Sequence, residues 1–255
     1  MLEKVKGIIT SSQWTFCSKS TLLNKFMKLG DRVVDGIFLE RPNRYLASVE
    51  INGQEIKAHV PDPGRLPGLM IPGNSVRLIY NPGPKRKTDY SLVLVRHGDI
   101  WVSVYPVFAN KVVEKELADR NLSCLSGYEN FNREVKCGES RFDFQLEFLD
   151  IKAFVEVKSV SLVEEGMGKF PDAPTQRGVK HLKELIALRL KDFRSVVLFV
   201  SQRSDARSIT SNDEIDPLFG EWLRKAHLAG VELYAYNCSV TKNTVSIKNQ
   251  IPVNI

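Results

Sequence analysis

Hydrophobic and polar residues alternate in short runs over the first part of the chain, from about residue 34 to residue 106. Alternation with a period of two is typical of β-strands that have one buried face. Asn52-Gly53 separates two of these runs and predicts a tight hairpin turn. Roughly five or six strands in about 70 residues predict a small antiparallel β-barrel, such as an OB-fold.

A different pattern begins near Val107. Helical segments are expected at 110–122, 176–190 and 215–230, and strand-like runs lie between them. Strands separated by helices predict an α/β domain. The first 34 residues are an extension without an assigned role, in which the stretch 22–30 favours a short helix that ends at a glycine.

Two adjacent strand-like runs in the α/β region predict an antiparallel hairpin with a turn at 149–150. The first run alternates, with Phe142, Phe144, Leu146 and Phe148 on one side and Arg141, Asp143, Gln145 and Glu147 on the other. The second run, 153–160, is mostly apolar but contains Glu156 and Lys158. Matching apolar residues across the hairpin gives the pairs Phe142–Val157, Phe144–Val155 and Leu146–Ala153. This register places Asp143 opposite Glu156, with Lys158 beside them.

The preceding run adds a third acid to the same face. A two-residue turn at Gly138-Glu139 pairs Val135 with Phe142, so that Glu134 lies opposite Asp143. Carboxylates at that distance repel each other unless a cation or a proton lies between them. The cluster of Glu134, Asp143 and Glu156 therefore predicts a site for a hard divalent cation, Mg²⁺ or Mn²⁺. Lys158 would orient water or stabilise negative charge on a phosphate. A purely structural Glu156–Lys158 ion pair is the alternative.

A second group of polar residues lies at the start of the helix expected at 176–190. Thr175 is a suitable N-cap, and the residues on the polar side include Arg177, Lys180 and His181. Because the N-terminal end of a helix favours anions, a nucleic-acid phosphate would fit there. A solvated amphipathic helix is the alternative.

Composition and charge add a polyanionic partner to this picture. The 255 residues are 43% hydrophobic, which is sufficient for a core, and the formal net charge is +6. The expected nucleic-acid contacts in the barrel region are Arg41, Arg44, Tyr45, Arg65, Lys85, Arg86 and Lys87. The run 85–87 is also compatible with a solvated basic loop.

The sequence favours a cytoplasmic protein that does not act at a membrane. No apolar run is long enough to span a bilayer, and the N-terminus lacks the apolar stretch of a secretory signal. The four cysteines are scattered and form no metal-binding spacing, as expected of reduced thiols.

An ordered set of motifs resembles the sugar fermentation stimulation protein A family. The motifs are ERPNRYLASV, AHVPDPGRL, SGYENFNREV, SRFDF, VEVKSVSL and FPDAPTQRGVKHLKEL, which begin at residues 40, 58, 126, 140, 155 and 170. The resemblance implies an α/β protein with an OB-fold at 35–106 and a PD-(D/E)XK nuclease-like domain with a mixed sheet at 107–255. In that superfamily, an Asp and a Glu-x-Lys hold a divalent metal and position water, and these roles fall on Asp143, Glu156 and Lys158.

The resemblance also bears on the partner. The block of Thr175, Arg177, Lys180 and His181 matches the family's signature, and the family is described as DNA-binding, so DNA rather than RNA is the expected partner. The sequence departs from the family in its first 34 residues, which extend beyond the usual start, and in Asp62, where Asn is expected. The second departure weakens any contact of that loop with phosphate.

Three functions are compatible with the sequence. The first is a metal-dependent nuclease, which the complete set of Asp143, Glu156 and Lys158 favours. The second is a non-catalytic DNA-binding regulator linked to sugar-metabolism genes. The third is a hydrolase of a small phosphoester, for which the barrel would be only a scaffold.

Overall fold

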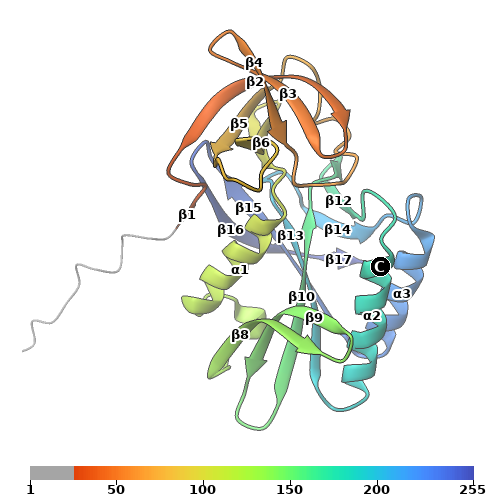
Figure 1. Ribbon diagram of the computed structural model, residues 1–255. Coiled ribbons are helices and arrows are strands. Elements are labelled where there is room, and N and C mark those ends of the chain that lie inside the picture. Colours follow the sequence, from red (N-terminus) through yellow and green to blue (C-terminus); the bar gives the residue numbers. More distant parts are fainter. Residues whose placement is uncertain (1–25) are drawn as a thin grey trace, which may run out of the picture.

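A computed structural model describes residues 26–255, which form a small barrel and an α/β domain (Figure 1). Cys17 and residues 22–25 of the expected helix lie outside the described residues. The helix prediction is wrong where it can be compared, because Met27–Lys28 forms strand β1 and pairs with a strand of the α/β domain. Among the described helices, none is long and apolar enough to cross a membrane.

The barrel has the expected antiparallel strands and one parallel closing pair. Its strands are β2 (Val33–Asn43), β3 (Leu46–Ile51), β4 (Gln54–His59), β5 (Ser75–Tyr80), β6 (Tyr90–His97) and β7 (Ile100–Ser103). Strands β2 to β6 form a closed barrel through the β4–β6 pairing. Strand β7 pairs antiparallel with β6. Asn52 and Gly53 both have positive φ, as the predicted hairpin turn requires. The OB-fold prediction is therefore confirmed.

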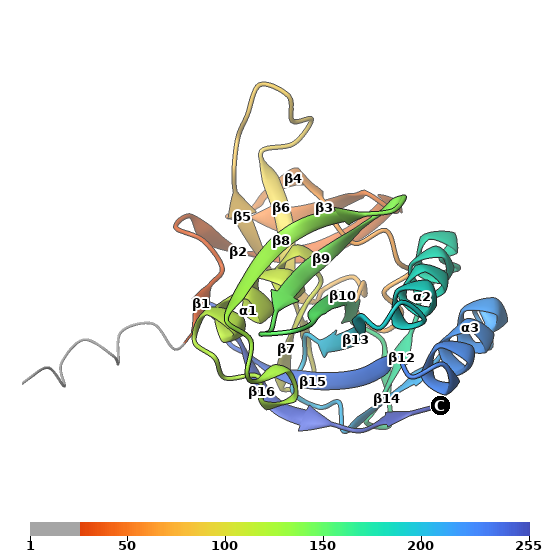
Figure 2. The same ribbon diagram turned by 90° about the horizontal axis from the view of Figure 1, so that it is seen from below.

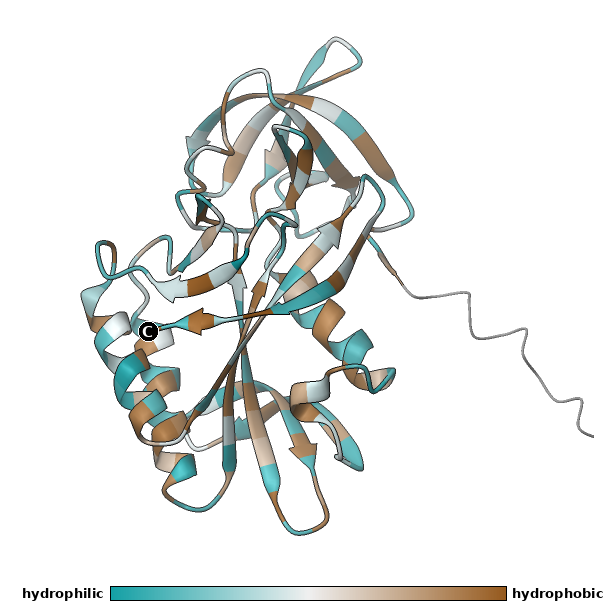
Figure 3. Cartoon of the chain, turned by 180° about the vertical axis from the view of Figure 1, so that it is seen from behind, coloured by the Kyte–Doolittle hydropathy of each residue, from teal (hydrophilic) through white to brown (hydrophobic). Residues whose placement is uncertain are grey.

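Alternation along the barrel strands builds its core. Bands of apolar and polar residues alternate along these strands (Figure 3). The inward positions include Phe38, Val49, Leu78 and Leu92, all of which are at most 1% exposed. Because every second residue points inward, a short segment contributes both a dry core and a polar outer surface.

The α/β domain is built on a mixed seven-stranded sheet in the order β1-β16-β15-β13-β10-β9-β8. Its strands are β8 (Asn130–Cys137), β9 (Ser140–Glu147), β10 (Lys152–Val160), β13 (Arg194–Ser201), β15 (Glu232–Val240), β16 (Thr244–Ile251) and β1. Strands β10, β13 and β15 run parallel, whereas the outer pairs are antiparallel. A smaller sheet contains β11 (Val163–Glu164), β12 (Met167–Phe170), β14 (Ser208–Ser211) and β17 (Val253–Asn254).

Helices cover the two faces of the large sheet (Figures 1 and 2). Helix α1 (Val107–Ala118), followed by the short 3₁₀ turn Ser123–Leu125, packs on one face. Helices α2 (Gln176–Arg189) and α3 (Pro217–Leu228) pack on the other. Val155 and Val157 of β10 belong to the α1 core, and Phe154 belongs to the α2–α3 core. Residues of β10 with even numbers therefore face α2.

One part of the predicted alternation is wrong. Phe144 and Leu146 lie in the α1 core, as expected, but Phe142 lies in the α2–α3 core. Strand β9 changes phase between these positions, opposite a residue of β8 with left-handed backbone, Glu134, whose φ is 51°. The change in phase occurs at Asp143, the residue on which the candidate site depends.

Candidate active site

The predicted hairpin register holds along one half of β9 and β10 and then ends. Phe144 pairs with Val155 and Leu146 with Ala153, as expected. The β9–β10 pairing ends at Phe144–Val155, so the predicted direct opposition of Asp143 and Glu156 is not formed. The predicted Phe142–Val157 pair is also not formed, so the two strands separate two positions earlier than the hydrophobic pattern indicates.

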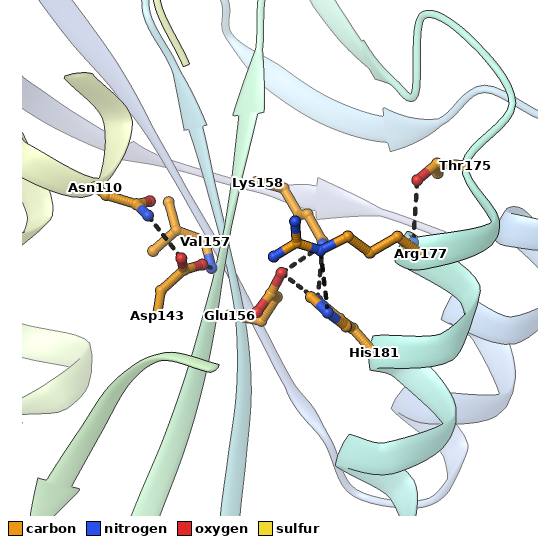
Figure 4. A network of polar contacts seen from close by, with 9 residues as sticks. Asn110, Asp143, Glu156, Val157, Lys158, Thr175, Arg177 and His181 are labelled. Carbon is orange, nitrogen blue, oxygen red and sulfur yellow. Dashed lines mark hydrogen bonds and ion pairs between the residues drawn. The ribbon is translucent and has the colours of Figure 1, made fainter. Parts of the chain in front are cut away.

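The carboxylate of Asp143 fills the opening between the separated strands. Its Oδ2 accepts a hydrogen bond from the backbone N–H of Val157 at 2.8 Å, in the place of a β9 carbonyl. Its Oδ1 accepts another from the side-chain amide of Asn110 on α1, at 2.6 Å. Figure 4 shows this carboxylate beside β10, near Val157. The Asp143 carboxylate is therefore held both by a side chain of α1 and by the backbone of β10.

Glu156 and Lys158 project from β10 toward α2, where they meet His181 (Figure 4). The Lys158 ammonium donates to Glu156 Oε1 at 2.7 Å, and His181 Nδ1 contacts the same oxygen. Glu156 and Lys158 are 4% and 8% exposed, and His181 is 3% exposed. One carboxylate oxygen thus has two partners in a site from which water is largely excluded.

Arg177 defines which nitrogen of His181 carries the proton. Its Nε–H donates to His181 Nε2 at 3.4 Å, so Nε2 must be the acceptor. The other ring nitrogen, Nδ1, then carries hydrogen and donates to Glu156 Oε1. The sequence placed His181 among nucleic-acid contacts, and the structure buries its side chain against Glu156, so that its described contacts are within the protein.

The two carboxyl groups of the site have opposite pKa shifts. Burial, followed by the nearby charge of Glu156, raises the pKa of Asp143 to about 6. Burial alone would also raise the pKa of Glu156, but Lys158 and His181 outweigh it and lower that pKa below its usual value. The charge of Glu156 therefore acts on Asp143, although its effect is smaller than that of burial.

The donor set fits a hard divalent cation. Glu156 Oε2 is buried and has no hydrogen-bond partner, and an oxygen in this state is costly unless a cation or water contacts it. The carboxyl of Asp143 lies within the electrostatic reach of Glu156, and burial, followed by that charge, raises its pKa. Carboxylate oxygens are the ligands that Mg²⁺ and Mn²⁺ prefer. Asp143 and Glu156 are therefore the residues that would hold the ion.

The predicted three-acid cluster is not formed. Val135 pairs with Phe142 as expected. Glu134, the residue before Val135 on β8, is exposed. Across residues 26–255, no group of three or more His, Cys, Asp and Glu side chains is arranged to hold a metal. The left-handed backbone at Glu134 interrupts the regular β8 geometry on which the prediction relied.

The start of α2 carries its expected cap and two exposed cations. Thr175 Oγ1 accepts from Gly178 N at 3.0 Å, so the N-cap prediction is confirmed. Arg177 and Lys180 are exposed, and Lys180 forms a 3.2 Å ion pair with Glu139 of the β8–β9 turn. The polar end of α2 therefore adjoins both the buried site and the hairpin that contributes Asp143.

The cations expected in the barrel differ in their exposure and in their hydrogen bonds within the protein. Arg41 donates to the carbonyl oxygens of Arg44, Asp62, Gly64 and Arg65, so its guanidinium organises two loops. The other residues predicted to contact nucleic acid in the barrel are all exposed: Arg44, Tyr45, Arg65, Lys85, Arg86 and Lys87. A role of these residues in nucleic-acid binding stays a prediction.

Two features of the site were missed in the sequence. Asn110 lies on α1, far from Asp143 in the chain, and no local pattern marks it. Asp62 of the barrel and Asp172 of the α/β domain line one cavity of about 280 Å³, and burial, followed by Asp172, raises the pKa of Asp62 to about 6. Leu66 N donates to Asp172 at 3.4 Å, so this acid joins the two domains.

Comparison with known proteins assigns the chain to a family. Two family models match: the SfsA N-terminal OB domain at residues 39–104 and the Sugar fermentation stimulation protein RE domain at 107–244. A Sugar fermentation stimulation protein homolog of Desulforamulus reducens is 45% identical over 224 residues, which are 88% of this chain and 93% of that protein. A homolog of Caldanaerobacter subterraneus subsp. tengcongensis is 40% identical over 227 residues, 89% and 99% of the two chains.

A solved structure agrees with this assignment. It is described as the structure of Pyrococcus furiosus SfsA in complex with Ca²⁺, and it is 30% identical to this chain. Its fold matches with a TM-score of 0.82, over 91% of this chain and 99% of that one. The chain therefore belongs to the sugar fermentation stimulation protein family, as the ordered motifs in its sequence indicated.

Proposed function

We propose that this protein is a divalent-metal-dependent phosphodiester hydrolase that acts on nucleic acid. The observation that carries the proposal is the buried, unpartnered Oε2 of Glu156 beside the carboxyl of Asp143. A buried carboxylate oxygen without a partner is expected where an ion binds. The α/β domain is then of the PD-(D/E)XK type, with Asp143, Glu156 and Lys158 as its catalytic residues.

The metal is proposed to be Mg²⁺ or Mn²⁺. The related Pyrococcus furiosus protein was solved with Ca²⁺, another hard cation that takes oxygen ligands, which supports a site of this class. When bound, such an ion polarises a phosphate oxygen and makes a coordinated water more acidic. Asp143 and Glu156 would bind it through one or more carboxylate oxygens each.

The other residues of the site have separate roles. His181 donates to Glu156 Oε1 and thereby keeps Oε2 available, because the side chain cannot rotate without losing that bond. Lys158 places a buried ammonium beside the same carboxylate. A fixed positive charge in a dry site stabilises negative charge as it develops on a phosphate far better than a charge in water would.

Binding of the polyanion is proposed to depend on the exposed cations outside this site. The chain has a net charge of +6, and Lys85, Arg86 and Lys87 are all exposed in the β5–β6 connection. In Figure 2 this connection projects beyond the strands of the barrel. Phosphate contacts of this kind give affinity without sequence preference, and DNA is the proposed substrate.

The decisive experiment compares two lysines of the same strand. Lys158→Ala removes the buried ammonium, and Lys152→Ala removes an exposed one on β10. Both proteins and the wild type are incubated with single-stranded, duplex and structured DNA and RNA, in Mg²⁺, Mn²⁺ or EDTA. Cleavage by the wild type should require metal, fall by about 100-fold or more in Lys158→Ala, and remain in Lys152→Ala.

Folding and binding are the controls for this comparison. Thermal melting must show that Lys158→Ala is native, because loss of one partner of a buried ion pair costs about 3–5 kcal/mol. Nucleic-acid affinity should stay nearly unchanged, since it is spread over many phosphates. A native Lys158→Ala protein with the full rate of cleavage would contradict the catalytic assignment. A wild type that binds DNA and cuts nothing would instead support a non-catalytic regulator.

A further inference from the structure

A cavity of about 580 Å³ opens on the barrel, away from the metal-binding carboxylates. The β2–β3 turn, the end of β4 and the β5–β6 connection form it, and its lining includes Asn43, Tyr45, Leu46, His59, Arg86 and Lys87. None of the residues that line it within 26–255 is acidic. A concave surface that combines an aromatic ring, cations and no carboxylate is suited to an anionic ligand with a flat ring.

Tyr45 presents its ring on a fixed backbone. The side chain is 52% exposed, although large aromatic residues bury most of their surface when they only stabilise a fold. The backbone is held because Tyr45 N donates to Asn43 Oδ1 at 2.9 Å and Tyr45 O accepts from Val60 N at 2.9 Å. The Arg44 guanidinium lies 6.0 Å from the ring centroid. The ring is thus an oriented platform with a cation beside it.

Polar groups around the ring match the rest of a nucleotide. Arg86 is held in place by donating to Ser91 Oγ at 2.7 Å and to Thr88 O at 3.2 Å, and Lys87 is exposed. These two residues offer positive charge to phosphate. His59 lies on the cavity wall, and burial, followed by the charge of Arg86, lowers its pKa. A neutral imidazole both donates and accepts hydrogen bonds, as recognition of a base edge requires.

We propose that this cavity binds an unstacked base of single-stranded nucleic acid, with the base on Tyr45 and the adjoining phosphates on Arg86 and Lys87. The inference rests on the proposed action on nucleic acid and deepens it by naming the form of the substrate. In a duplex, both faces of each base are covered by neighbouring pairs, so a ring of this kind has no base to stack on. In a single strand, every base offers a face, and stacking on an aromatic side chain is tolerant of sequence.

Hydrogen bonds connect the cavity to the catalytic domain. The Arg41 guanidinium joins Arg44 O, beside Tyr45, to Asp62 O at 2.7 and 2.9 Å. The loop that contains Asp62 also contacts the α/β domain, because Leu66 N donates to the carboxylate of Asp172. Asp172 lies three residues before Thr175, the N-cap of α2. The cavity is therefore held at a defined position relative to α2, the helix that carries His181. A strand bound on Tyr45 would keep a fixed offset from Glu156.

The test measures binding in EDTA, where no cleavage takes place. Fluorescence anisotropy with a labelled single-stranded DNA of about 12 nucleotides, a length within the range that OB-folds cover, gives affinities for the wild type, Tyr45→Ala and Tyr45→Phe. Tyr45→Ala should weaken single-strand binding by about 10- to 100-fold, because one stacking contact is lost. Tyr45→Phe keeps the ring and should bind within about threefold of the wild type. Duplex affinity should not change in either variant.

A second readout detects stacking directly. A 2-aminopurine base in the same single strand should lose fluorescence on binding to the wild type and to Tyr45→Phe, and not on binding to Tyr45→Ala. Equal single-strand affinity of wild type and Tyr45→Ala would overturn the proposal, as would equal weakening of duplex binding or a wild type that does not bind single strands. Failure of the nuclease assay would leave these results unchanged, so the two proposals are tested separately.

Discussion

Replacement of Asp143 by Asn should make the protein more stable at neutral pH while removing a metal ligand. The wild-type carboxyl is buried and near Glu156, and its pKa is raised from 3.8 in an exposed chain to about 6 in the fold. A folded-state pKa above the unfolded value means that the folded protein binds the proton more tightly. Ionised Asp143 therefore opposes folding, and a neutral amide does not.

The size of the effect follows from two opposing contributions. A difference of about two pKa units corresponds to about 3 kcal/mol that the ionised carboxylate costs above pH 6. Asn offers one acceptor oxygen where Asp143 uses two, toward Val157 N and Asn110, so one hydrogen bond worth about 1 kcal/mol is lost. The net gain is about 1–2 kcal/mol at pH 8, or roughly 2–8 °C in melting temperature for a chain of this size.

The dependence on pH gives the sharpest form of this prediction. The penalty of the wild-type carboxylate vanishes only well below pH 3.8, where the group is protonated in both states, and it grows as pH rises from 3.8 to about 6. The variant should therefore be more stable than the wild type at pH 8 and slightly less stable at pH 4. Calorimetric melting of both proteins in EDTA across this range measures the difference, in which titrating groups remote from Asp143 cancel. A difference that does not vary with pH would refute the assignment of Asp143 as a strained buried acid.

Two other predictions test the surroundings of the site. Reversing the charges of Lys85, Arg86 and Lys87 should weaken DNA binding equally for unrelated sequences. It should also reduce the magnitude of the slope of log K against log salt concentration by about 2–3, which titrations at several salt concentrations measure. An unchanged slope would exclude this loop from the DNA-binding surface. Gly64→Ala should lower the melting temperature, because an added Cβ would overlap the Asp172 carboxylate, whereas Gly83→Ala meets only Arg86 at 3.5 Å and should not; equal melting temperatures would show that the Asp172 contact adapts freely.

The sequence predicted those parts of the fold that local patterns determine. Asn52-Gly53 defined a hairpin, and apolar matching gave the Phe144–Val155 pair, because a shift of one residue would expose every core side chain. The same reasoning failed at Asp143, where the strands separate. A bond from a side chain to Val157 N replaces the ladder there, and alternation carries no signal for it.

The chemistry of the site was predicted in part for the same reason. Glu156 and Lys158 share a face because they lie two apart on one strand, as the sequence indicated. His181 looked like a surface residue because it lies among cations on α2, and only the packing of α2 against β10 shows that it is 3% exposed. Asn110 contacts Asp143 across 33 positions of the chain, beyond the reach of any local pattern.

The position of a metal ion in crystals of the protein tests the proposed metal site without relying on an activity. Crystals of the wild type and of Glu156→Gln are soaked in Mn²⁺, and anomalous difference maps are calculated for both. We expect one strong peak in contact with Asp143 and with Oε2 of Glu156, and its loss in the variant, since a neutral amide is a poor ligand for a hard cation. A map without a peak between these two side chains, at Mn²⁺ concentrations that give peaks elsewhere, would contradict the proposed metal site.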